Sequence, residues 1–154
     1  MQRARAGQLI RAARLDNSMT QSQLAQAAGI HQPSLAAYEL ARRTPRPETL
    51  RAILKAAKTR PSIPLQLFAD DILAAATGRG LSNVRVFGST IRGEDTESSD
   101  IDLLVSVSAD SSLFDLAGFS LDVERITGFR ADVIADSAAL GGYLAHVREE
   151  AIAL

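Results

Sequence analysis

The chain has 154 residues, of which 46% are hydrophobic and none is cysteine, so disulfides and thiolate metal sites are excluded. No apolar run approaches the ~20 residues of a membrane span, and no apolar signal-peptide core follows Met1, so we expect a cytoplasmic protein without a membrane partner. Residues 1–60 hold eleven Lys and Arg against three acidic residues (+8), whereas the remainder holds six against fifteen (−9). A basic half indicates a polyanionic partner and an acidic half a metal ion or cationic partner, although two solvated faces are an alternative.

Residues 1–60 are predicted to form four helices. The first runs from about residue 3 to 15, and Thr20 and Gln23 have the pattern of a capping box that begins the second. Gly29 supplies the positive φ of a tight turn. A third helix opens at His31 or Gln32, and a fourth ends near Lys58. The expected inward-facing residues are Leu9, Ile10, Ala13, Leu24, Ala25, Ala28, Leu35, Tyr38, Leu50, Ile53, Leu54 and Ala57, with Leu40 as a further candidate.

Two short helices joined by a glycine-containing turn are typical of the helix-turn-helix unit, whose second helix enters the DNA major groove. The stretch MTQSQLAQAAGIHQPSLAAYELARRTPRPETL resembles the Cro/phage-repressor (Xre) helix-turn-helix family, and the resemblance extends over residues 5–58. It implies an ion pair between Arg14 and Glu39. It also implies a phosphate contact from Gln21 and base-reading positions at 32, 33, 34 and 37.

Of the base-reading positions, only Gln32 and Ser34 carry side chains that can hydrogen-bond a base edge. We therefore expect modest sequence readout by each monomer and DNA binding as a homodimer. Arg42 and Arg43, with Arg46 close behind, suit contacts to DNA phosphates. The alternative is a helix-turn-helix that binds only proteins.

Residues 61–154 are predicted to form a second domain, because Pro61 and Pro64 interrupt the helical pattern where the basic region ends. An amphipathic helix begins at Pro64 and ends before Gly78. Strands are expected at residues 83–87, 101–107 and 130–134, with a one-turn helix after the first strand and a helix over 113–127 after the second. A final helix is expected over 137–153. The chain is thus predicted to be α+β, with an all-α domain (1–60) followed by a small α/β domain (61–154) around a short mixed sheet.

Five residues of the second domain carry the predicted chemistry. Because Gly88 has no Cβ, a phosphate can approach its backbone, and the Ser89 N–H and hydroxyl can donate to that phosphate. Asp100 and Asp102 are two residues apart on a strand, so both carboxylates project from one face, as in sites that hold Mg²⁺ against a triphosphate. Asp132 lies between apolar residues of the third strand, where a carboxylate needs a partner or a metal. Each feature alone is common in structural turns and strand surfaces, but together they predict one site.

Gly-Ser, ten intervening residues, Asp-x-Asp and a later strand Asp form a spacing that resembles the polymerase-β-type nucleotidyltransferase superfamily. The runs VFGSTIRGEDTESSDIDLLV and GFRADVIA resemble its minimal nucleotidyltransferase branch over residues 64–150. The resemblance implies that Gly88 and Ser89 bind the triphosphate of ATP. It also implies that Asp100, Asp102 and Asp132 are catalytic and hold Mg²⁺, with Asp132 helping to deprotonate an acceptor hydroxyl.

The resemblance and the sequence also give predictions for other residues between Ser89 and Asp100. The resemblance places Arg92 where it can contact a phosphate or the acceptor, so it joins the nucleotide-binding set. Ile91 stands where the family commonly has Ala, which would narrow the pocket. The acidic residues Glu94, Asp95 and Glu97 are expected to be solvated.

The resemblance also implies a biological role. Minimal nucleotidyltransferases are commonly encoded beside a HEPN-type ribonuclease toxin, and some transfer AMP from ATP to a tyrosine of that toxin. A fused Cro-like domain fits binding to operator DNA. We therefore expect an antitoxin that binds its operator and nucleotidylates its toxin. Two alternatives stay open: a repressor-antitoxin without enzymatic activity, and a transferase that acts on RNA or a small molecule.

Overall fold

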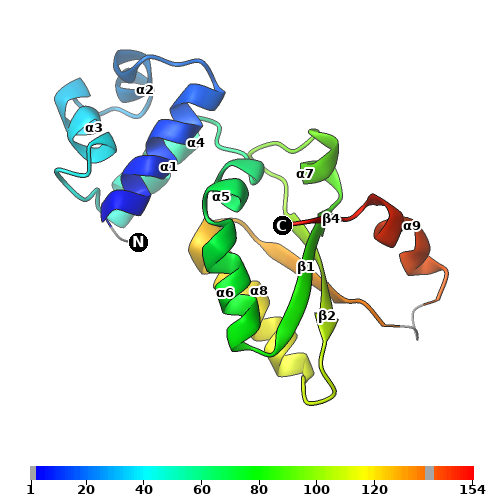
Figure 1. Cartoon of the computed structure of the whole chain (residues 1–154). Helices are drawn as coiled ribbons and strands as arrows, with labels where there is room; N and C mark the ends of the chain where they lie inside the picture. Colours follow the sequence, from blue (N-terminus) through cyan, green and yellow to red (C-terminus); the bar gives the residue numbers. More distant parts are fainter. Residues whose placement is uncertain (1–2, 138–140) are drawn as a thin grey trace. The chain divides into compact units, whose positions relative to one another are not determined.

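The structure is a computed structural model that describes residues 3–137 and 141–154. The chain divides into two compact units, Met1–Ile63 and Pro64–Leu154 (Figure 1). Within the described residues, no helix is long and apolar enough to cross a membrane.

The first unit is a small helical bundle. Its helices are α1 (Arg3–Asp16), α2 (Gln21–Ala27), α3 (Gln32–Glu39) and α4 (Pro47–Ala56), and α5 (Ser62–Leu67) begins at its end. The predicted capping box is confirmed, since the Gln23 N–H donates to Thr20 Oγ1 at 3.1 Å and the Thr20 N–H donates to Gln23 Oε1 at 2.8 Å. The positive φ of Gly29 (68°) is also confirmed.

Apolar side chains from all four helices of this bundle share one core. The fully buried members are Ile10, Ala13, Leu24, Ala25, Leu35, Ile53 and Ala57. Leu40, a candidate for this core, is instead 59% exposed. It follows the last residue of α3 and precedes Ala41, whose left-handed φ of 54° turns the chain away from the helix direction.

The second unit is built around a four-stranded mixed sheet with the order β3-β2-β1-β4. Its elements are α6 (Ala69–Gly78), β1 (Leu81–Phe87), α7 (Ser89–Arg92), β2 (Ile101–Val107), α8 (Leu113–Thr127), β3 (Ala131–Ala135), α9 (Tyr143–Glu150) and β4 (Ile152–Ala153). The strand pairs β1–β2 and β1–β4 are antiparallel, whereas β2 and β3 are parallel and are connected through α8. The predicted fold class, a helical N-terminal domain followed by a small α/β domain, is confirmed.

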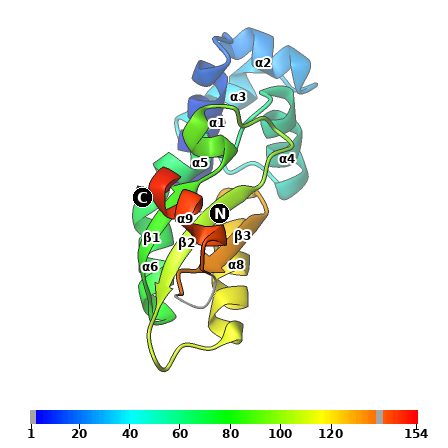
Figure 2. The same ribbon diagram turned by 90° about the vertical axis from the view of Figure 1, so that its right-hand side faces the viewer.

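Helices cover both faces of this sheet. Figures 1 and 2 show α6 and α8 on one face and α9 on the other. Odd-numbered residues of β2, such as Leu103, point into the core formed with α6 and α8, whereas Leu104 packs against Leu144 and Val147 of α9. Because alternate residues of a strand share a face, Asp102 lies on the α9 side of the sheet.

Three details of the second unit differ from the sequence-based expectation. The helix expected from residue 64 is divided into α5 and α6 at Phe68, whose φ of −116° and ψ of 23° are not helical. Strand β1 begins at Leu81 instead of residue 83, with a bulge around Asn83, which has φ 50°. The final helix is confined to α9, because Ala151 is extended and the next two residues pair with β1 as β4. Part of its expected range, residues 138–140, lies outside the described residues.

Candidate functional site

The turn after β1 brings backbone directly against a carboxylate. Gly88 has φ 75° and ψ −153°, a conformation that is essentially restricted to glycine. A Cβ at this position would overlap Asp102 Oδ2 and would lie 3.1 Å from Asp102 Cγ. The one-turn helix α7 starts at the next residue, Ser89. The sequence folds in this way because only glycine combines this backbone conformation with such a close approach.

The predicted aspartates lie at neighbouring positions on adjacent strands. Asp102 is the register partner of Asp132 across the parallel β2–β3 pair and of Phe87 across the antiparallel β1–β2 pair. Asp100 immediately precedes β2, two residues before Asp102, so its backbone position is on the same face. The structure therefore places Gly88 and the three aspartates around the beginning of β2.

The neighbouring acidic groups act electrostatically on Asp102. Burial raises the pKa of Asp102, and the negative charges of Asp132 and Asp100 raise it further, while the nearby Arg92 lowers it. Oxygen donors of this kind are the ligands that Mg²⁺ prefers. As the side chains are placed, the described residues contain no group of three His, Cys, Asp or Glu that could hold a metal ion.

Two acidic residues have surroundings that differ from the expectation. Asp132 was predicted to need a partner or a metal among apolar neighbours, but β3 is an edge strand and the residue is exposed. Asp95 was expected to be solvated together with Glu94 and Glu97, but it is only 6% exposed. Glu94 and Glu97 are exposed as expected.

Arg92, the last residue of α7, is held by two carboxylates. Its Nε donates to Glu94 Oε2 at 2.9 Å and its Nη1 donates to Glu150 Oε1 at 2.6 Å. The other oxygen of Glu150 accepts from the Gly88 N–H at 3.4 Å. The bond from Arg92, aided by the one from Gly88, lowers the pKa of Glu150, and both carboxylates raise the pKa of Arg92. A glutamate at the end of α9 is thus part of the turn that follows β1.

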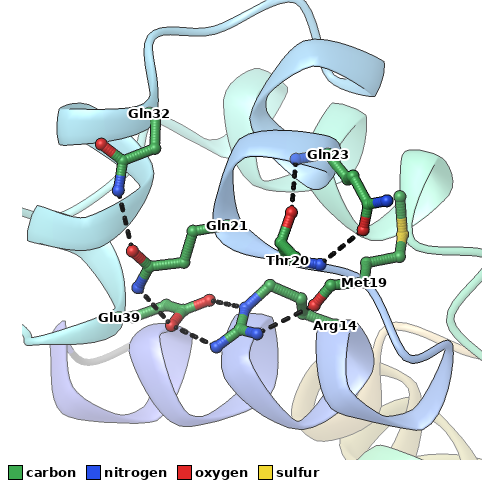
Figure 3. Close-up of polar contacts among 7 residues, drawn as sticks. All are labelled: Arg14, Met19, Thr20, Gln21, Gln23, Gln32 and Glu39. Atoms are coloured by element: carbon green, nitrogen blue, oxygen red, sulfur yellow. Dashed lines mark hydrogen bonds and ion pairs between the residues drawn. The ribbon is translucent and has the colours of Figure 1, made fainter.

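In the first unit, the candidate DNA-contacting residues are linked by a chain of hydrogen bonds (Figure 3). Gln32 Nε2 donates to Gln21 Oε1 at 2.8 Å, and Gln21 Nε2 donates to Glu39 Oε2 at 3.0 Å. Glu39 also accepts from Arg14 Nε at 2.6 Å and Nη2 at 3.0 Å, so the implied ion pair is present.

The Arg14–Glu39 pair is buried, with side chains 12% and 4% exposed. Burial alone would raise the pKa of Glu39, but the hydrogen bonds from Arg14 and Gln21 outweigh it and lower the pKa. The ion pair therefore fixes Gln21, and Gln21 orients Gln32 at the start of α3. Ser34 is partly exposed on the same helix, and Arg42, Arg43 and Arg46 are exposed after it.

A family model described as a nucleotidyltransferase domain matches residues 74–151, half of the chain. The chain belongs to this family. A second family model, described as helix-turn-helix, matches residues 10–63. The protein is thus a nucleotidyltransferase with an N-terminal Cro/Xre-type DNA-binding domain.

Two archaeal relatives of the nucleotidyltransferase are named as protein adenylyltransferases. One, from Methanocaldococcus jannaschii, is 38% identical over 55 residues, which are 36% of this chain but only 59% of that protein. The other, MntA from Thermococcus cleftensis, is 33% identical over 73 residues, 47% of this chain and 74% of that protein. A solved structure of a minimal nucleotidyltransferase is 37% identical with a TM-score of 0.53, covering 58% of this chain and 92% of its own.

The sequence-based prediction missed two residues that support the nucleotidyltransferase site. Glu150 was not identified because 62 residues separate it from Gly88, and only the packing of α9 on the sheet brings it back. Asp136 could have been found, because it continues the alternation of Asp132 and Ile134 on one face of β3. It accepts from Arg85 of β1 at 2.8 Å and from Arg148 of α9 at 2.7 Å, and these bonds tie α9 to the sheet.

Proposed function

We propose that this nucleotidyltransferase transfers AMP from ATP to a hydroxyl group of a partner protein, and that it acts as the antitoxin of a toxin–antitoxin pair. The observation that carries the catalytic part is the contact of the Gly88 backbone with Asp102, whose register partner is Asp132. This contact supports the proposal that the Gly-Ser turn binds phosphate beside two carboxylates in one small site.

In the proposed reaction, Gly88 and Ser89 bind the triphosphate through backbone and hydroxyl donors. The acceptor hydroxyl attacks the α-phosphorus, the bond from this phosphorus to the bridging oxygen of the β-phosphate breaks, and pyrophosphate leaves. The hydroxyl proton passes to Asp132, which is exposed and therefore accessible to an incoming acceptor. The AMP moiety ends in a phosphodiester linkage to the partner.

Asp100 and Asp102, with Asp132, are the residues proposed to hold Mg²⁺. The fit rests on their oxygen donors and on the crowding of negative charge that raises the pKa of Asp102, since a divalent cation would relieve both the repulsion and the desolvation. When bound, Mg²⁺ neutralises triphosphate charge and orients it for in-line displacement.

A protein acceptor is proposed for two reasons. Both archaeal relatives are named as protein adenylyltransferases. In addition, residues 61–154 have a formal charge of −9. This charge complements the basic RNA-binding groove of a ribonuclease toxin, and we propose a toxin of the HEPN type as the partner. AMP added near such a groove would place negative charge where RNA phosphates bind, so inhibition would outlast dissociation of the two proteins.

The test is label transfer to the ribonuclease that co-purifies with the protein. With ATP labelled at the α-phosphate and Mg²⁺, the partner should become labelled, whereas ATP labelled at the γ-phosphate should leave it unlabelled. Asp102→Asn should abolish the labelling. Labelling of RNA or of a small molecule in place of the protein would support the alternative acceptor classes.

For the first unit, we propose binding of a homodimer to an inverted repeat in the operator of its own genes. Support comes from the +8 charge of residues 1–60 and from Gln32, which the bonds through Gln21 to Glu39 hold in a fixed orientation. Affinity should fall steeply as salt concentration rises. In a gel-shift assay, equal affinity for the native upstream region and for random DNA would contradict the proposal.

A catalytically silent antitoxin that only masks the toxin remains the competing function. It requires neither the contact between Gly88 and Asp102 nor the pairing of Asp102 with Asp132. Full neutralisation of the toxin by Asp102→Asn, without any modification of the toxin, would support it.

A further inference from the structure

One carboxylate group connects both ends of α7. Glu150 Oε1 accepts from Arg92 Nη1 at 2.6 Å, and Glu150 Oε2 accepts from the Gly88 N–H at 3.4 Å. Arg92 is the last residue of this helix and Gly88 is the residue before its first. The two oxygens of a single side chain therefore span the whole Gly-Ser turn. The bond to Arg92 is short and charge-assisted, so it is the stronger of the two.

The helix that carries Glu150 is itself fixed to the sheet. Leu144 and Val147 of α9 are buried against Leu104 of β2. On the same helix, Arg148 shares Asp136 with Arg85 of β1. Apolar packing and the ion pairs of Asp136 with Arg85 and Arg148 hold α9 on the sheet. The position of Glu150 is therefore set by the packing of α9 and does not depend on the turn itself.

We propose that Glu150 is a positioning residue for nucleotide binding, which holds the Gly-Ser turn in the conformation that receives the triphosphate. This inference rests on the proposed nucleotide site at Gly88 and Ser89. Glu150 engages the N–H of Gly88 and leaves the N–H and hydroxyl of Ser89 to the phosphate, since the described residues offer these two donors no protein acceptor.

The conformation of the turn also affects the carboxylate of Asp102. Gly88 lies so close to Asp102 that no Cβ fits between them. A turn that loosens would therefore change the space around Asp102 as well as the phosphate donors. Holding the turn in advance lowers the ordering cost of binding, because the conformation is already formed before the nucleotide arrives.

The test measures turn mobility and nucleotide affinity in Glu150→Ala and Glu150→Gln. Hydrogen exchange of the peptide that covers Gly88 and Ser89 should be faster in Glu150→Ala than in the wild type. The Kd for Mg²⁺–ATP, measured by calorimetry, should rise about tenfold in Glu150→Ala and less in Glu150→Gln, which keeps one oxygen acceptor. In an Arg92→Ala background, Glu150→Ala should raise the Kd for Mg²⁺–ATP little further, because the two residues act as a unit.

Glu94→Ala is the matched control. Glu94 pairs with the same guanidinium but is 65% exposed and, unlike Glu150, does not bond to Gly88. Its removal deletes an equal negative charge and should leave the Kd within twofold. A melting curve identifies any variant that fails to fold.

Four outcomes would overturn the inference. Unchanged exchange of the turn in Glu150→Ala would show that Glu150 does not hold it. Tighter Mg²⁺–ATP binding in Glu150→Ala but not in Glu94→Ala would show that the carboxylate competes with phosphate. No Mg²⁺–ATP binding by the wild type would overturn the proposed function together with the inference, whereas wild-type binding with an unaffected Glu150→Ala would overturn the inference alone.

Discussion

The substitution Gly88→Ala tests the proposed phosphate-binding turn most specifically. The backbone of Gly88, at φ 75° and ψ −153°, lies in a region that costs an L-residue about 1–3 kcal/mol. In addition, the new Cβ would overlap Asp102 Oδ2. The Asp102 side chain would have to rotate away to remove this overlap, because its backbone is held in strand β2. We therefore expect the free energy of unfolding to fall by about 1–3 kcal/mol and nucleotide transfer to be lost through the displaced carboxylate.

Gly93→Ala provides the matched control at the other end of α7. Gly93 also has a positive φ, 70°, but a Cβ there would meet no atom within 4 Å. The cost should be limited to the left-handed conformation, about 1 kcal/mol, and transfer should persist. The assays are urea unfolding and labelling with ATP labelled at the α-phosphate. If Gly88→Ala transferred AMP as fast as Gly93→Ala, the contact with Asp102 would have no catalytic importance.

The remaining predictions concern single polar side chains. Burial and the neighbouring acids raise the pKa of Asp102, so the ionised carboxylate destabilises the folded state. Asp102→Asn should therefore melt no lower than the wild type at pH 7. Any gain in its melting temperature should vanish as the pH falls below about 4, where Asp102 of the wild type is protonated. A large loss of melting temperature at pH 7 would mean that this carboxylate is structural. Gln32→Ala should weaken operator binding by ~1–3 kcal/mol and relax its specificity. Gln21→Ala should weaken operator binding less, because the Gln21 side chain is bonded to Gln32 and Glu39 within the protein; gel-shift titrations measure both losses. Glu39→Gln leaves Arg14 buried without its carboxylate and should lower the free energy of unfolding by about 3 kcal/mol at pH 7. Since the pKa of Glu39 is lowered, this difference should shrink in urea titrations as the pH falls through that lowered value.

The sequence predicted those parts of the fold that depend on local patterns. The capping box at Thr20 and the ion pair between Arg14 and Glu39 follow from short motifs and a family resemblance, and both are present. The strand β2 was predicted at its observed bounds because apolar residues recur at every second position from Ile101 to Val107.

The parts that were not predicted depend on tertiary packing. β4 has only two residues, and it forms because α9 ends at Glu150 and returns the chain to the edge of β1. The exposure of Asp132 follows from the place of β3 at the sheet edge, which periodicity cannot reveal. Glu150 belongs to no local motif, and its contact with Gly88 arises only when α9 packs across the sheet.

We propose that the protein neutralises its partner by covalent transfer of AMP. The most direct measurement is the intact mass of the co-purified ribonuclease after incubation with Mg²⁺, ATP and the wild-type protein, followed by separation of the two proteins and an RNase assay. We expect a mass increase of about 329 Da per AMP and a ribonuclease that stays inactive after separation, with neither effect when Asp102→Asn is used. A ribonuclease of unchanged mass that is fully neutralised by both the wild type and Asp102→Asn, and that recovers its activity on separation, would contradict covalent neutralisation.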